Sequence, residues 1–119
     1  MANWVVPQLP QAFWGEVWIG GQPAPAGTLV EGHAENVRLP AYNNPFIVTA
    51  AGKLGGKGGF DPKLVVQGSF QIGGAGPIPS GSPVVFIVDG LPAWVWFDGI
   101  WQMSVPFQSG AVTQVVLAR

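Results

Sequence analysis

Cysteine is absent from this 119-residue sequence. Its absence excludes disulfide bonds, a thiolate nucleophile and any zinc site with cysteine ligands. Basic residues are also scarce, and they are scattered along the chain at Arg38, Lys53, Lys57, Lys63 and Arg119. Because nucleic-acid binding depends on neutralising a run of phosphates, we expect no nucleic-acid partner.

Charge of either sign is scarce. Charged residues make up 9% of the sequence, against roughly 25% in an ordinary soluble domain. The surface must therefore be covered largely by glycine, proline, amide, serine and apolar side chains. Such a surface favours a protein that contacts identical subunits, a neighbouring module or a flat ligand.

Long hydrophobic runs are missing too. No stretch approaches the roughly 20 apolar residues of a membrane span, so we expect no membrane insertion. Residues 1–10 show neither the basic nor the apolar region of a signal peptide. We expect either a chain used without Sec export, as a virion structural protein would be, or an excised mature segment.

What the sequence does contain is strand residues separated by turn residues. Eighteen glycines and twelve prolines are spread along the whole length, which leaves no room for long helices. Short runs rich in Val, Ile, Phe and Trp lie between them and predict strands. The predicted strands are 3–6, 12–19, 28–35, 45–50, 63–67, 69–72, 83–89, 93–97, 100–105 and 112–118.

Alternation and turn residues refine this prediction. Residues 13, 15, 17 and 19 fall on one face of their strand, and Trp14, Glu16 and Trp18 on the other. The continuously apolar run 84–88 predicts a central strand covered on both sides. The pairs Asp89-Gly90 and Asp98-Gly99 predict tight hairpins, so that 84–88, 93–97 and 101–105 would form an antiparallel meander.

Two further segments are predicted as loops, and one as an arm. Proline is expected to keep the turn at 20–27 out of the ladder, and the five glycines of 51–62 predict a long exposed loop. Residues 12–119 are expected to form a single domain. Residues 1–11, isolated by prolines, are expected to be an extended arm or an edge strand.

Three stretches resemble a known family of modules. They are 13–30 (FWGEVWIGGQPAPAGTLV), 59–68 (GFDPKLVVQG) and 85–90 (VFIVDG). These resemble prealbumin-like β-sandwich modules, including carboxypeptidase regulatory-like and Cna-B-like domains. The resemblance implies an all-β, Greek-key sandwich of the immunoglobulin or prealbumin-like kind, used as a spacer, stalk or adhesion module of microbial surface or virion proteins.

One chemical feature of that family is not carried over. Some Cna-B-like members cross-link a Lys of an early strand to an Asn of the last strand. Here no Lys precedes Lys53, and residues 112–119 contain no Asn.

The best metal-site candidate is weak. Glu31, His33 and Glu35 fall on one face of a predicted strand, and such a row could hold a divalent metal. No fourth ligand is apparent, and acidic side chains two residues apart are typical of a solvated strand face. We therefore predict no metal and no cofactor.

Catalytic patterns are also missing. No serine lies in a G-x-S-x-G turn, and two of the six acidic residues, Asp89 and Asp98, lie in hairpin turns, where the side chain bonds the backbone. The glycine-rich segment 52–59 is not a phosphate-binding loop of the G-x-x-x-x-G-K-[ST] type. We predict that the protein is not an enzyme.

Tryptophan is the residue in excess. A domain of this size rarely buries six indoles, although one same-face pair could fill the core and each single ring is more often buried than exposed. Exposed indoles would serve a subunit interface or a sugar-stacking surface. The candidate interface or ligand residues are Trp4, Trp14, Trp18, Trp94, Trp96 and Trp101.

These observations predict a non-enzymatic structural or assembly module. It would be a virion decoration protein or an extracellular surface or fibre subunit that associates with copies of itself or with neighbouring structural subunits through apolar strand edges and tryptophan-bearing faces. The alternative is a carbohydrate-binding module that uses exposed tryptophans.

Overall fold

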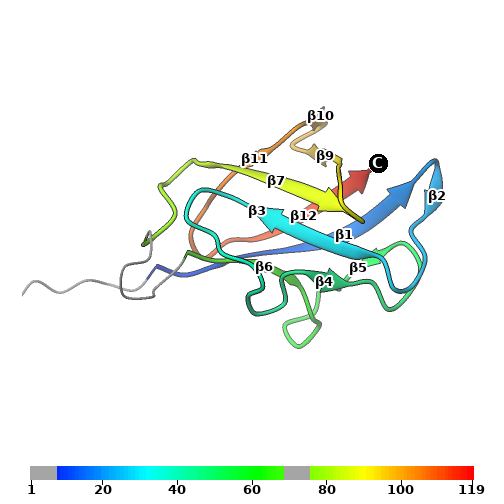
Figure 1. Cartoon of the computed structure of the whole chain (residues 1–119), viewed down its shortest axis with the longest axis horizontal. Coiled ribbons are helices and arrows are strands. Elements are labelled where there is room, and N and C mark those ends of the chain that lie inside the picture. The colour runs from blue at the N-terminus through cyan, green and yellow to red at the C-terminus, as the bar shows by residue number, and fades with distance from the viewer. Residues whose placement is uncertain (1–7, 69–75) are drawn as a thin grey trace, which may run out of the picture.

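The computed structural model describes residues 8–68 and 76–119, and this part of the chain forms strands and no helix (Figure 1). The strands predicted at 3–6 and 69–72, and most of the predicted arm, lie outside the described residues. The strands are β1 (Gln11–Ile19), β2 (Gln22–Pro23), β3 (Leu29–His33), β4 (Phe46–Ile47), β5 (Lys53–Leu54), β6 (Leu64–Val66), β7 (Pro83–Val88), β8 (Leu91–Pro92), β9 (Trp94–Phe97), β10 (Ile100–Gln102), β11 (Val105–Pro106) and β12 (Val112–Ala118).

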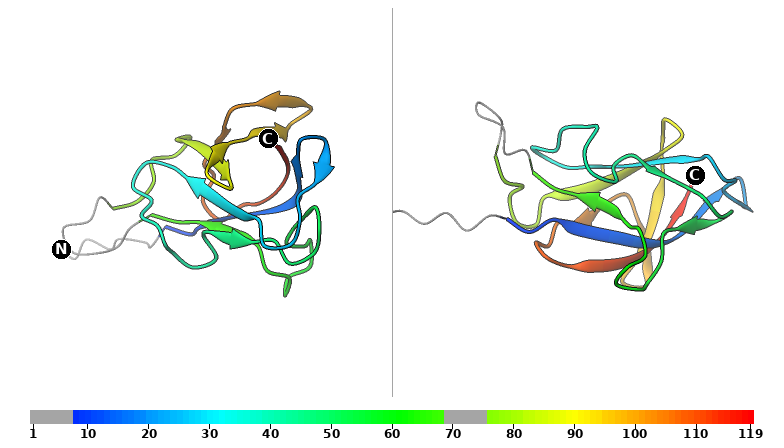
Figure 2. Two further views of the ribbon diagram at one scale, coloured as in Figure 1. Left: turned by 45° about the vertical axis from the view of Figure 1, so that its right-hand side comes forward. Right: turned by 90° about the horizontal axis from the view of Figure 1, so that it is seen from below.

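The strands form two sheets that pack as a sandwich, which confirms the predicted all-β class. In the described residues the larger sheet has seven strands in the order β10-β9-β12-β1-β2, with β5 and β6 also pairing β1. The smaller sheet has the order β11-β7-β3-β4, with β8 pairing β7. β1 and β12 run parallel and side by side along the molecule (Figure 2).

The core lies between the two sheets and is filled by Phe, Val, Leu and Ile side chains. Phe13 of β1 meets Phe86 of β7 edge to face, with ring centroids 5.1 Å apart and planes at 84°. Both rings are buried, so this pair ties the larger sheet to the smaller one, in a geometry that aromatic rings favour.

The predicted tight hairpins are confirmed. Val88 pairs with Leu91 around Asp89-Gly90, and Phe97 pairs with Ile100 around Asp98-Gly99. All four turn residues have positive φ angles between 45° and 83°, which is the geometry of the type I′ turn that Asp-Gly favours.

The predicted meander is wrong in its first pairing, of 84–88 with 93–97, whereas the antiparallel pairing of 93–97 with the strand that follows it is confirmed. β9 pairs with β10 and β12 instead of β7, so the chain crosses from the smaller to the larger sheet at Ala93. Ala93 still donates its N–H to Phe86 O of β7 at 3.0 Å, and the chain leaves β7 after this bond. The stretch predicted as one strand at 100–105 is divided in the same way, because β10 belongs to the larger sheet and β11 pairs with β7.

Three other expectations need correction. Pro23 does pair in a ladder, opposite Trp18. The N–H that bonds to β1 here is that of the next residue, Ala24, which donates to Val17 O at 2.9 Å. The ladder therefore requires no N–H from Pro23. The predicted loop 51–62 contains β5, whose Leu54 is fully buried. β7 is covered on one face only, because Val85 on its outer face is 37% exposed.

A buried amide completes the edge of β3. Asn44 is fully buried; its Oδ1 accepts from the Gly32 N–H at 3.0 Å and its Nδ2 donates to Gly32 O at 2.8 Å. The side chain thus bonds both backbone groups that a neighbouring strand would otherwise bond.

Replacing the Asn44 side chain tests how much this amide contributes to the free energy of unfolding. Asn44→Ala leaves the buried N–H and C=O of Gly32 without partners, and we expect a loss of about 3 kcal/mol in the free energy of unfolding. The exposed Thr49→Ala is the control and should change it by less than about 0.5 kcal/mol. Urea denaturation measures both, and equal midpoints for the two variants would show that water replaces the amide without cost.

Gly15 tests the contact between β1 and β12. It has φ +147°, and a Cβ built on it would lie 1.8 Å from Val115 O. Gly15→Ala should therefore cost roughly 3 kcal/mol or more, because backbone must move. Gly20→Ala is the matched control: its φ is +58° but no atom lies within 4 Å of the added Cβ, so only the left-handed conformation should cost about 1 kcal/mol. Thermal unfolding that ranks the two variants in the opposite order would contradict the close approach.

Candidate functional site: the outer face of the larger sheet

The tryptophans of β1 and β9 point away from the core. In β1, Phe13 and Val17 are fully buried, so Trp14 and Trp18 lie on the opposite, outer face. In β9 the buried residue is Val95, which places Trp94 and Trp96 outside, 54% and 41% exposed. Strand alternation therefore assigns four indoles to the outer face of one sheet.

Strand register places these four tryptophans and Trp101 in three rows. Trp101 of β10 lies opposite Trp96, which lies opposite Val116 of β12. In the next row Trp94 lies opposite Ala118, which lies opposite Trp18. Trp14 lies opposite Gln114 of β12 in a third row. All five tryptophans of the described residues thus share the outer face of the larger sheet.

The expectation that one same-face pair fills the core is wrong, and so is the expectation that a single tryptophan is more often buried. None of the five described tryptophans is buried, and Trp4 lies outside the described residues. Alternation predicted which indoles share a face. It could not predict which face is inside, because the alternate residues, such as Val95, are apolar as well.

Part of this face is strongly apolar. Trp96 and Trp101 meet edge to face, with ring centroids 5.4 Å apart and planes at 64°. Trp94 lines a hollow of about 370 Å³ together with Met103 and two outer residues of β7, Val85 and Ile87. The exposed side of β7 therefore continues into the tryptophan rows.

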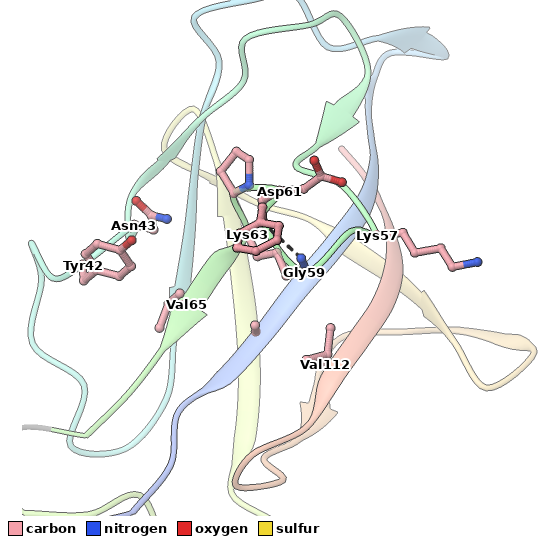
Figure 3. A pocket seen from close by; sticks show the side chains of 11 residues that line it. Tyr42, Asn43, Lys57, Gly59, Asp61, Lys63, Val65 and Val112 are labelled. Carbon is pink, nitrogen blue, oxygen red and sulfur yellow. Dashed lines mark hydrogen bonds between the residues drawn. The ribbon is translucent and has the colours of Figure 1, made fainter.

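The other end of the face carries a hollow of about 570 Å³ (Figure 3). Its floor is a row of small apolar side chains, Val112, Ala12 and Val65, paired across β12, β1 and β6. Tyr42 and Phe60 also line the hollow, and they are 72% and 106% exposed.

The loop that carries Phe60 is held by its own polar groups. Asp61 Oδ2 accepts from the Gly58 N–H at 2.7 Å, and Lys63 Nζ donates to the carbonyls of Gly58 and Asp61. A Cβ on Gly56 would lie 2.5 Å from Asp61 Oδ2, so the loop depends on glycine there. These bonds fix the loop that presents Phe60 to solvent.

Sequence reasoning missed Tyr42 and Phe60 as site candidates. One signal in the sequence could have indicated an exposed ring at Phe60. It is the only aromatic residue in the stretch GGKGGFDP, and a segment so rich in glycine offers little apolar surface to bury a ring. No pattern in the sequence brings Tyr42 next to this loop, because the two meet only through the pairing of β6.

The other sequence candidates form no larger site. His33 Nε2 lies 2.9 Å from Glu31 Oε1, whereas Glu35 follows the end of β3. Within residues 8–68 and 76–119 no three His, Asp or Glu side chains come together as metal ligands would. In the same part of the chain, no helix has the length and apolarity of a membrane span.

Comparison with family models, with curated proteins and with solved structures gives no match for this chain. The outer face of the larger sheet is therefore interpreted from its own chemistry.

Proposed function

We propose that the protein is a non-enzymatic assembly module that pairs with a second copy of itself through β10 and the adjoining tryptophans. The observation that carries the proposal is the character of this edge. β10 is the last strand of the larger sheet and pairs only with β9 among the described residues. Its first two residues, Ile100 and Trp101, are 59% and 47% exposed.

Exposed edge strands usually carry a device against pairing. Lysine, proline or a bulge commonly blocks the free N–H and C=O groups of such a strand. β10 is short, with three residues, but its sequence, Ile-Trp-Gln, has no charge and no proline. An edge of this kind favours antiparallel pairing with the same edge of another copy, which closes a two-fold dimer.

The neighbouring surface supports burial against a partner. Trp96 and Trp101 adjoin the hollow formed by Trp94, Met103 and Val85. Tryptophan and methionine are enriched in interfaces, and few charged residues interrupt their centres. Sugar stacking is less favoured at this place, because the Trp96 and Trp101 rings stand at 64° to each other and offer no common plane.

The setting that fits such a module is a virion or an extracellular surface, and the prealbumin-like Greek-key relationship remains part of this proposal. The two-sheet architecture and the two-residue hairpin at Gly20-Gly21 support that relationship.

A charge at the β10 edge tests the proposal. Ile100→Lys should weaken self-association at least tenfold, because the lysine obstructs pairing of the edge. Ile47→Lys is the matched control, since Ile47 is 56% exposed on β4, the edge strand of the smaller sheet. We expect light scattering to give a dimer for the wild type and for Ile47→Lys, and a monomer for Ile100→Lys at the same concentration.

Two results would contradict the proposed self-association through β10. One is a wild-type protein that stays monomeric up to the highest soluble concentration. The other is equal association of the two lysine variants.

A further inference from the structure

Three hollows follow one another across the outer face of the larger sheet. The hollow at Tyr42 and Phe60 shares Lys57 with a hollow of about 350 Å³ beside Trp14. That second hollow shares Gln114 with a third, of about 330 Å³, beside Trp96. Because neighbouring hollows share lining residues, the three form a continuous line from β6 across β1 and β12. An elongated ligand could occupy all three hollows at once.

Aromatic rings mark several of these subsites. Tyr42 and Phe60 line the first hollow and Trp14 the second. Figure 3 shows Tyr42 and Lys57 on opposite sides of this first hollow, and Lys57 points away from Asp61. Phe60 is fully exposed, so its ring contributes nothing to the core, and its loop is held in place by the bonds of Asp61 and Lys63. A preorganised loop with a bare ring is suited to binding.

The polar groups along the line are mixed and nearly neutral. Asn43 and Gln114 each offer a donor and an acceptor, Lys57 offers donors, and Glu16 and Asp61 offer acceptors. Lys53, which also lines the second hollow, lies opposite Glu16 across the β1–β5 ladder. A ligand that suits this set carries many hydroxyl groups, which both donate and accept, and has no net charge.

An extended peptide fits less well. Peptides that bind to sheets add a strand to a free edge through main-chain hydrogen bonds. Here the hollow lies over the face of β12, β1 and β6, and the backbone N–H of Val65 is already directed to Asn43 O at 3.4 Å. The floor offers only the side chains of Val112, Ala12 and Val65, with no main-chain edge.

We propose that this line of hollows is a binding site for an extended, neutral oligosaccharide, with Tyr42 and Phe60 stacking on sugar rings at one end. The tested end of this line is separate from the proposed self-association, because Tyr42, Phe60 and Lys57 belong neither to the β10 edge nor to the hollow at Trp94 and Met103. The third hollow, beside Trp96, borders that surface.

Titration calorimetry with neutral hexasaccharides tests the inference. The probes are the hexaoses of β-1,4-glucose, β-1,3-glucose, β-1,4-xylose, β-1,4-mannose, α-1,4-glucose and β-1,4-N-acetylglucosamine, each compared with its disaccharide. At least one hexaose should bind, and at least tenfold more tightly than its disaccharide, because a disaccharide cannot reach from the first hollow to the second. Phe60→Ala and Tyr42→Ala should each lower that affinity about tenfold, which corresponds to about 1.4 kcal/mol.

Ile47→Ala is the control, since Ile47 is an exposed apolar residue of the other sheet, and it should bind as the wild type does. A reduced, unfolded polypeptide such as carboxymethylated lactalbumin is added as a competing probe. The inference is wrong if no hexaose binds at millimolar concentration, if the polypeptide binds in place of the sugars, or if Phe60→Ala and Tyr42→Ala both retain wild-type affinity. Light scattering of the same variants separates this outcome from a failure of self-association.

Discussion

The parallel pairing of β1 with β12 is the constraint on which the rest of the structure depends. It joins the first long strand to the last in an unbroken register from Ala12 opposite Val112 to Trp18 opposite Ala118. A shift of one residue in either strand would turn its outward side chains toward the core. The close approach of Gly15 to Val115 permits this register. β9 pairs with β12 and adds the rows that carry the tryptophans, and β6 pairs with β1 and adds the floor of the hollow at Tyr42 and Phe60.

Local features of this fold were predictable, whereas its long-range pairing was not. The alternation of β1 and the Asp-Gly turns depend on neighbouring residues, and both were predicted correctly. The crossing of the chain between sheets at Ala93 depends on which distant strand offers a free edge, and the sequence contains no local signal for that. The tryptophans were identified as candidates from the composition alone. Their common outer face depends on long-range pairing, so it became evident only from the register of β9 with β12.

The outer face divides into two regions of different chemistry, and the scarcity of charge serves both. Around Trp94, Trp96 and Trp101 the neighbours are apolar and the sheet ends in an uncharged edge. Around Tyr42 and Phe60 the neighbours are one amide, Asn43, a few charges of both signs and small apolar side chains. The first region suits contact with another copy of the chain, and the second suits a hydroxyl-rich ligand, so an assembled particle would still display Tyr42 and Phe60.

The central claim is that these two regions are separate surfaces, both open in the free chain. Hydroxyl-radical footprinting read by mass spectrometry, in dilute and in concentrated protein, tests it directly. We expect Trp96, Trp101 and Tyr42 to be oxidised readily in dilute protein, and only the two tryptophans to become protected as the concentration rises. If Trp96 and Trp101 were as unreactive in dilute protein as the buried Phe13, or if Tyr42 were protected together with them, the account would be contradicted.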